Sequence, residues 1–280
     1  MRFVKMHGTG NDFVLLQPQR EDEDWPHLAR TLCDRHFGIG ADGVILVLPS
    51  DRADVRMRIF NPDGSEAEMC GNGIRCLVRY AVETGLARPR DGQLMVETAA
   101  GVLPAWVDVE DGQVQRVRVG MGVPRFSPQE VPVRAQGPGP LLSLPLEVGG
   151  HRLSLTCLSL GNPHAVHFLD GPVEEFPLQE VGPAVEHHPL FPQRVNFGVA
   201  RVLDRGHVEL RVWERGAGPT LACGSGATAA VVAARLHDLV DSRVEVHLPG
   251  GTLTIEWDGR GEAYLSGPAQ WVFEGRWLGQ

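Results

Sequence analysis

Two cysteines stand in the same short motif, and they are the residues most suited to chemistry in this chain. Cys70 opens Cys-Gly-Asn-Gly and Cys223 opens Cys-Gly-Ser-Gly. A cysteine can release or accept a proton, and the glycines allow the main chain to approach a bound group closely. Two such thiols could therefore act as acid and base on opposite faces of one carbon atom.

The other cysteines do not suggest a second kind of site. The chain has five cysteines in 280 residues, an odd number that disfavours a disulfide framework. Cys70 and Cys76 are separated by more residues than the Cys-x-x-Cys spacing of common metal sites. We expect Cys76 to lie in the core, and we expect neither a metal nor a cofactor.

The two motifs belong to an internal repeat. Residues 54–76 align without a gap on residues 207–229, and residues 94–103 match residues 244–253. In the first register, identical residues meet at Val55/Val208, Arg58/Arg211, Cys70/Cys223, Gly71/Gly224 and Gly73/Gly226. Each half of the chain should therefore contain the same succession of elements.

That succession places each thiol at the start of a helix. Residues 54–60 and 207–213 alternate apolar and polar side chains, which predicts half-buried strands. After each Cys-Gly-x-Gly motif, residues 74–84 and 227–239 have the composition of buried helices. The sequence predicts an α+β fold of two pseudo-symmetric domains, each a curved, mostly antiparallel β-sheet or barrel around a central helix.

A Pro/Gly-rich span marks the expected domain boundary or a long surface loop. Residues 124–140 include five prolines and two glycines. We expect one domain over residues 1–123 and the other over residues 124–268. Residues 269–280 are expected to return to the first domain as a closing strand.

Composition excludes several classes of protein. The chain is 42% apolar with a net charge of −9, and it has no dense Lys/Arg cluster, so nucleic acid is not an expected partner. No segment is apolar enough to cross a bilayer, and the first residues show no signal peptide, so we expect a cytoplasmic protein without membrane partners. Whether it forms a homodimer is left open.

A helix N-terminus suits proton transfer at an amino acid. Its N–H groups and positive dipole end bind a carboxylate and should lower the pKa of a cysteine placed there. Inverting an α-carbon requires one group to remove a proton and another to deliver one to the opposite face. Two helix ends aimed at one carboxylate would also stabilise the charge that develops on it, without a cofactor.

Three motifs resemble those of the diaminopimelate epimerase family: residues 6–13, residues 64–73 and residues 214–218. Further matches lie at residues 36–42, 161–166 and 194–198, and the resemblance extends from residue 6 to about residue 235. It implies two similar domains and interconversion of LL- and meso-diaminopimelate in lysine and peptidoglycan synthesis. It also implies that Cys70 and Cys223 are the acid/base thiols.

The resemblance implies a set of binding residues as well. His164 and Glu214 would adjust the pKa values of the thiols. Small-molecule binding is implied for Asn11, Asn61, Gly71, Asn72, Asn162, Asn196, Glu214, Arg215, Gly224 and Ser225. Two positions depart from the family pattern, because Gly43 replaces the Gln of some members and Pro219 replaces the Glu of many.

Other functions remain open at this point. Proline or hydroxyproline racemases share the logic of paired cysteines, whereas a phenazine-type isomerase would not need both thiols. A cysteine hydrolase would need one nucleophile with a histidine, for which His164 could serve. A non-catalytic amino-acid-binding protein could use the same helix ends but would have no use for two thiols.

Overall fold

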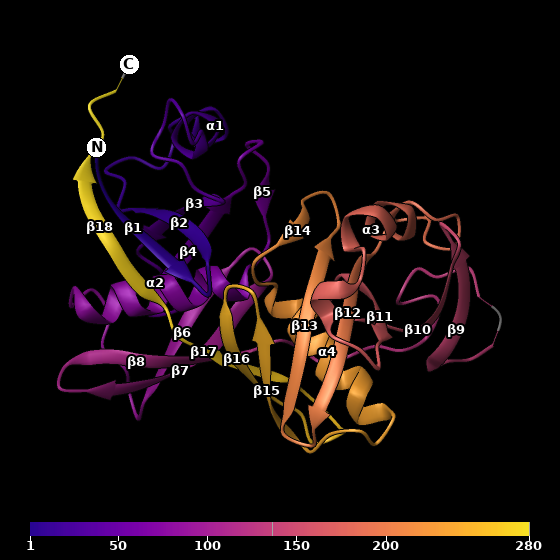
Figure 1. Cartoon of the computed structure of the whole chain (residues 1–280). Helices are drawn as coiled ribbons and strands as arrows, with labels where there is room; N and C mark the ends of the chain where they lie inside the picture. The colour runs from indigo at the N-terminus through magenta and orange to yellow at the C-terminus, as the bar shows by residue number, and fades with distance from the viewer. Residues whose placement is uncertain (136, 280) are drawn as a thin grey trace. The chain divides into compact units, whose positions relative to one another are not determined.

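The structure, a computed structural model, describes residues 1–135 and 137–279 (Figure 1). Gln136, in the expected boundary span, and Gln280, at the end of the expected closing strand, lie outside the described residues. The chain forms two compact units: Met1–Gly120 with the segment from Ser266 onward, and Met121–Leu265. The sequence placed this division three residues later.

The first unit is a mostly antiparallel sheet with two helical crossovers. Its elements are β1 (Arg2–Gly8), β2 (Asn11–Leu16), α1 (Trp25–Cys33), β3 (Gly43–Leu48), β4 (Val55–Phe60), β5 (Glu66–Ala67), α2 (Gly71–Glu83), β6 (Gln93–Thr98), β7 (Gly101–Glu110), β8 (Gln113–Gly120) and β18 (Gln270–Arg276). The pairs β2–β3 and β4–β6 are parallel, and each is joined through a helix, as parallel neighbours require. The pairs β1–β2, β3–β4, β4–β5, β6–β7 and β7–β8 are antiparallel.

The second unit repeats this order. Its elements are β9 (Leu141–Val148), β10 (His151–Ser159), β11 (Pro163–Phe168), a 3₁₀ turn (Val173–Glu175), α3 (Leu178–Glu186), β12 (Asn196–Asp204), β13 (His207–Glu214), β14 (Gly218–Thr220), α4 (Gly224–Leu236), β15 (Arg243–Leu248) and β16 (Gly251–Glu256). Here β11–β12 and β13–β15 are the parallel pairs. β17 (Tyr264–Gly267) spans the division between the units. The expected fold class is confirmed.

The final strand completes the correspondence between the units. β18 pairs antiparallel with β1, as β9 pairs antiparallel with β10 in the second unit. In Figure 1 the yellow β18 runs beside the indigo β1. The end of the chain thus supplies to the first unit a strand that the second unit takes from its own beginning.

The two central helices are enclosed by strands of their own unit. α2 packs against β1–β4, β6 and β8, and α4 packs against β10–β13, β15 and β16. Ala and Val dominate the buried surface of α4, which keeps that helix narrow enough for strands to surround it. Both helices begin directly after the cysteine of their motif, three residues earlier than the sequence predicted.

Three cysteines are core residues. Cys33, Cys76 and Cys157 are buried, and burial raises the pKa of each thiol to about 12. Cys76 is therefore in the core, as expected. All five cysteines are free thiols.

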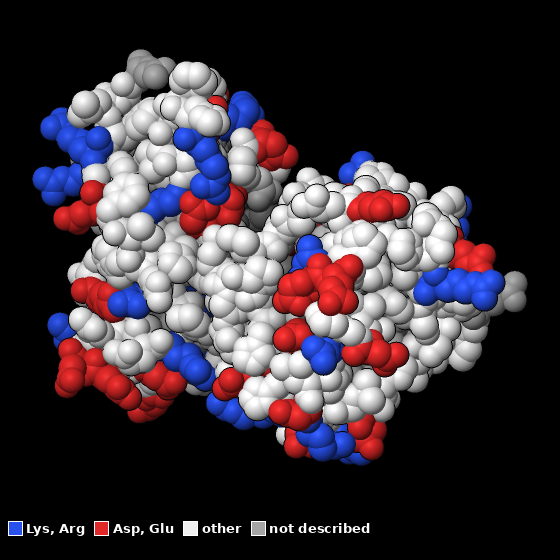
Figure 2. All heavy atoms as spheres, viewed as in Figure 1, with Lys and Arg blue, Asp and Glu red and all other residues white. Residues whose placement is uncertain are grey.

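Charges of both signs are interspersed over the face shown in Figure 2. Over the residues that the structure describes, none of the helices combines the length and apolar character needed to cross a membrane.

Candidate active site

Cys70 is the N-cap of α2. The first helical hydrogen bond runs from Ile74 N to Cys70 O at 2.8 Å, so the N–H groups of residues 71–73 precede the helical ladder. The third residue of the motif has a packing role, because a Cβ on Gly73 would lie 3.1 Å from Ile45 Cδ1. Glycine at this position lets the helix approach the sheet closely. The N–H groups that precede the ladder lie at the helix N-terminus, and anion binding by them stays a prediction.

The structure brings Asn11 and Asn72 beside this thiol. A two-residue turn, Thr9 and Gly10, joins β1 to β2 with positive φ at both residues, and Asn11 follows it. Asn11 Oδ1 lies 3.9 Å from Cys70 Sγ and accepts a hydrogen bond from Asn72 Nδ2 at 3.1 Å. The Asn11 amide, which was predicted to bind substrate, thus lies beside the thiol and is bonded to the side chain of Asn72.

Asn61 has a different local partner. Its Nδ2 donates to Ser65 Oγ at 3.0 Å, within the turn between β4 and β5. This bond shapes the turn that leads toward the Cys70 motif.

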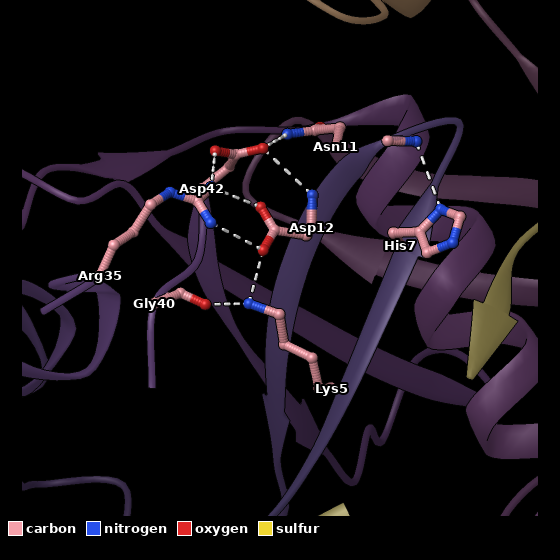
Figure 3. Close-up of polar contacts among 8 residues, drawn as sticks. Lys5, His7, Asn11, Asp12, Arg35, Gly40 and Asp42 are labelled. Carbon is pink, nitrogen blue, oxygen red and sulfur yellow. Dashed lines mark hydrogen bonds and ion pairs between the residues drawn. The ribbon is translucent and has the colours of Figure 1, made fainter. Parts of the chain in front are cut away.

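A charged cluster that the sequence analysis missed lies behind Asn11 (Figure 3). Asp42 accepts from Asn11 Nδ2 at 2.8 Å and from Arg35 Nη2 at 2.8 Å, while Lys5 contacts Asp12. Burial raises the pKa of Asp12, but the hydrogen bonds from Arg35 and Lys5 outweigh it and lower that pKa to about 2. Asp12 is therefore ionised at neutral pH, and the cluster holds the start of β2 in place.

Arg75 was also missed, because one charged residue in a helical pattern predicts a solvated surface position. Its side chain is instead fully buried beneath the β1–β2 turn. It donates to Asn72 Oδ1 at 2.9 Å and to Thr9 Oγ1 at 3.2 Å. Burial lowers the pKa of Arg75 to about 10, which leaves it cationic at neutral pH.

Cys223 is the N-cap of α4 and has its own polar chain. Its sulfur accepts from Gly226 N at 3.4 Å and lies 3.6 Å from Ser225 Oγ. Asn162 Nδ2 donates to Ser225 Oγ at 3.3 Å, and Asn162 Oδ1 lies 3.0 Å from His164 Nε2. Burial, with a smaller contribution from Arg215, lowers the pKa of His164 to about 3, so this histidine is neutral at neutral pH.

The expected lowering of the Cys223 pKa is wrong. Burial raises the pKa of Cys223 well above its usual value, and the charge of Glu214 raises it further. Hydrogen bonds from Ser225 and Gly226 act in the opposite direction but are outweighed. A helix N-terminus stabilises a thiolate only to the extent that this stabilisation exceeds the cost of removing it from water.

Glu214 and Arg215 lie at the end of β13 in a braced loop. Glu214 Oε1 accepts from Thr220 Oγ1 at 2.5 Å, and Arg215 N donates to Asn196 Oδ1 at 2.9 Å. Asn196 is buried and its Nδ2 donates to Pro163 O at 2.9 Å, so its amide connects two main-chain segments. Asn196 therefore holds the main chain of Arg215.

Glu186 supports the same loop and was not predicted. This buried residue accepts from Gly216 N at 2.9 Å and from Trp213 Nε1 at 2.7 Å. It lies on α3, so the sequence pattern offered no signal for its position beside the Glu214 loop.

The two departures from the family pattern have structural explanations. A Cβ on Gly43 would lie 3.0 Å from Phe60 O, so the close β3–β4 approach leaves little room for a side chain there. Pro219 lies in β14 opposite Trp213, where it stiffens the hairpin before Cys223.

A possible metal-binding group in the described part of the chain lies on the exposed side of β13 and β15. The donor atoms of His207, Glu245 and His247 lie within 4.8 Å of one another. This limit is wider than the roughly 3.4 Å between ligand atoms around one tetrahedral zinc ion. The imidazole rings of His207 and His247 are stacked on each other, and His207 is bonded to Asp204, so the group is explained as surface packing.

Comparison with known proteins identifies the family. The family model described as diaminopimelate epimerase matches residues 3–127 and 156–272. The diaminopimelate epimerase of Moorella thermoacetica is 53% identical over 278 residues, covering 98% of each chain, and that of Pelotomaculum thermopropionicum is 50% identical, covering 99% of each. The chain belongs to the diaminopimelate epimerase family.

Solved structures extend the likeness of the fold beyond this family. A probable proline racemase from Agrobacterium radiobacter has a TM-score of 0.74 at 16% identity, covering 99% of this chain and 92% of its own. A hydroxyproline epimerase from Agrobacterium vitis has a TM-score of 0.72 at 17% identity, covering 98% and 91%. A phenazine biosynthesis protein from Bacillus anthracis has a TM-score of 0.68 at 18% identity, covering 99% of each chain.

Proposed function

We propose that this protein interconverts LL- and meso-diaminopimelate, a step of lysine and peptidoglycan synthesis, with Cys70 and Cys223 as its acid/base pair. The observation that carries the proposal is the equivalent placement of these thiols in a member of the diaminopimelate epimerase family. Each is the N-cap of the central helix of its unit, within the same Cys-Gly-x-Gly motif.

In the proposed reaction, one cysteine removes the α-proton as a thiolate and the other delivers a proton as a thiol. The backbone N–H groups of Gly71, Asn72, Gly224 and Ser225 bind the carboxylate at the reacting carbon. These donors stabilise the negative charge that moves onto that carboxylate in the transition state. The reaction therefore needs proton transfer and fixed dipoles, and we propose that it uses no cofactor or metal.

The second amino-acid end of diaminopimelate requires its own polar partners. We assign the distal carboxylate to Arg215, whose guanidinium can form a bidentate pair with it. Asn196 holds the main chain of Arg215, and Gln193 O accepts from Arg215 Nη1 at 3.1 Å. Asn11, Asn61, Asn162 and Glu214 are assigned to the remaining amino and carboxylate groups.

A proline or hydroxyproline racemase is the second candidate, favoured by the likeness of the folds. Sequence identity to this chain separates the two candidates. It is 53% and 50% for the two diaminopimelate epimerases, against 16% and 17% for the two racemase structures. The polar loop around Arg215 also favours a substrate with a distal charged end.

The decisive experiment measures deuterium incorporation at the α-carbon of LL-diaminopimelate in heavy water, without added cofactor. The wild type should epimerise and exchange, and Cys70→Ala and Cys223→Ala should each abolish epimerisation. Cys76→Ala, which changes a core thiol on α2, is the matched control and should retain exchange. Inversion of proline with no action on diaminopimelate would favour the racemase, and exchange in both active-site variants would exclude the two-thiol mechanism.

A further inference from the structure

Two side-chain amides beside Cys70 connect a carboxylate to a guanidinium. Asp42 Oδ2 accepts from Asn11 Nδ2 at 2.8 Å, Asn11 Oδ1 accepts from Asn72 Nδ2 at 3.1 Å, and Asn72 Oδ1 accepts from Arg75 Nη1 at 2.9 Å. The four side chains come from the start of β2, the segment before β3 and the first turns of α2. We name them the amide chain.

The charged ends dictate the direction of every bond in the amide chain. An ionised carboxylate only accepts hydrogen bonds, so Asn11 must turn its NH₂ toward Asp42. A guanidinium only donates, so Asn72 must turn its carbonyl oxygen toward Arg75. The NH₂ of Asn72 then donates to the carbonyl oxygen of Asn11. Reversing either amide alone would place two NH₂ groups or two oxygens against each other.

Asp42 is itself held in one orientation. Arg35 Nη2 donates to Asp42 Oδ1 at 2.8 Å, and Asp12 N donates to the same Oδ2 that receives Asn11. Figure 3 shows these bonds converging on the carboxylate from two sides. The carboxylate is 42% exposed, so its replacement should not empty a core position.

Arg75 is held equally firmly at the other end. Besides Asn72, it donates to Thr9 Oγ1 at 3.2 Å and to Pro268 O at 3.2 Å. A Cβ on Gly8 would lie 2.9 Å from Arg75 Nη2, so a side chain there would displace the guanidinium from beneath the turn. Arg75 thereby connects the turn that carries Asn11 to the helix that carries Cys70.

We propose that Asp42 and Arg75 are positioning residues that orient the amide chain so that Asn11 presents its carbonyl oxygen to the Cys70 thiol. This oxygen is 3.9 Å from Cys70 Sγ and accepts its S–H. A hydrogen bond donated by the thiol stabilises its neutral form, which is the form that delivers a proton. The catalytic meaning of this arrangement rests on the function proposed above, whereas the orientation itself does not.

The test replaces the acceptor-only carboxylate by an amide of the same shape, Asp42→Asn. Alkylation of Cys70 by iodoacetamide is followed by the mass of its peptide between pH 6 and pH 10. In this variant the NH₂ introduced at position 42 opposes the present orientation of Asn11, while the NH₂ of Asn72 still opposes the reversed one, so Asn11 no longer has a single favoured orientation. Whenever the NH₂ of Asn11 faces the sulfur, the thiolate gains a donor, so the midpoint of alkylation should fall by roughly half to one pH unit. Arg75 and Cys76, two titratable groups of α2 that interact electrostatically with Cys70, are unchanged in this variant.

Two controls separate amide orientation from the loss of a charge. Asp12→Asn removes a carboxylate from the same cluster without touching the side chain of Asn11, and Asp34→Asn removes one that binds the main chain of His36 and Phe37. Circular dichroism checks that each variant is folded, and Asp34→Asn serves alone if Asp12→Asn is not.

A midpoint shift in Asp42→Asn that exceeds those of the folded controls supports the proposal. An unchanged midpoint, an upward shift, or a shift no larger than the controls overturns it. Because alkylation uses no diaminopimelate, this outcome is independent of whether the protein turns over that substrate.

Discussion

The two thiols of the Cys-Gly-x-Gly motifs share a position at a helix N-terminus but have different neighbours. Cys70 faces the carbonyl oxygen of Asn11, a hydrogen-bond acceptor. Cys223 receives a hydrogen bond from Gly226 N and lies beside Ser225, yet burial and Glu214 hold its pKa high. The repeat therefore supplies two thiols of the same type, and single residues around them set their individual acidities.

Glu214 provides a direct test of this difference. Glu214→Gln should lower the pH at which Cys223 ionises, because a negative charge beside the sulfur opposes formation of the thiolate. The titration can be followed by NMR of protein labelled with ¹³Cβ-cysteine. Glu209→Gln on the same strand is the matched control, since Glu209 pairs with Arg201. Equal shifts in the two variants would contradict the role of Glu214.

His164 should make the protein less stable in acid. Its folded-state pKa of about 3 lies below the usual 6.5, so the unfolded chain binds a proton first as the pH falls. The free energy of unfolding should therefore decrease between pH 6.5 and pH 3, by up to about 1.4 kcal/mol per pH unit from this residue. Urea unfolding at several pH values should show that the free energy of unfolding depends less steeply on pH in His164→Asn than in the wild type.

The comparison needs a histidine variant that does not alter a buried ring. His36 is exposed in the loop after α1, so the free energy of unfolding of His36→Asn should depend on pH as it does in the wild type. A dependence in His164→Asn as steep as that of the wild type would show that His164 does not contribute to it.

At the scale of elements, close packing of helix on strand positions each thiol. A Cβ on Gly226 would lie 3.0 Å from Val212 Cγ2 and 3.3 Å from Cys223 Sγ, just as Gly73 packs against Ile59 in the first unit. The equivalent contacts fall on equivalent residues of the repeat. The motif thus requires glycine for the position of the helix as well as for access to the main chain.

This packing predicts non-additive stabilities. Gly226→Ala should destabilise the protein by about 1–3 kcal/mol through overpacking, less a smaller gain in helix propensity. In Val212→Ala/Gly226→Ala the clash is relieved, so the double variant should be more stable than the sum of the single changes by roughly 1 kcal/mol. Urea unfolding measures all three variants, and strict additivity would show that the two side chains do not compete for this space.

Local patterns predicted only some elements. Alternation in residues 54–60 and 207–213 predicted β4 and β13, because one face of each strand is buried. The helix starts were placed too late, because the glycines of each motif have low helix propensity and hide the first turn. Their N–H groups nevertheless lie at the helix N-terminus, since the cysteine carbonyl accepts the first helical bond.

At the scale of the whole molecule, the last strand joins the two ends of the chain. β18 pairs with β1. The ring of Trp271 stacks on that of Tyr80 with 5.6 Å between the ring centroids, and the ring of Phe273 contacts that of Phe3 edge-on with 5.8 Å between the centroids. Deleting residues 270–280 should expose β1 as an edge and weaken the first unit selectively.

Amide hydrogen exchange can read this effect by segment. In the truncated chain, exchange should accelerate in β1 and β2, while β10–β13 should keep wild-type protection. Deletion of residues 278–280, which leaves β18 intact, is the control. Uniform acceleration over both units would show that they unfold as one.

The sequence alone determined the repeat, the thiols at two helix starts and the strands with one buried face, because each is written in the spacing of neighbouring residues. It did not determine the high pKa of Cys223, the burial of Arg75, or the contact of Asp42 with Asn11. Those depend on which residues distant in sequence become neighbours and on how much water folding removes. Only the tertiary structure could decide them, because desolvation and hydrogen-bond direction are properties of the assembled site.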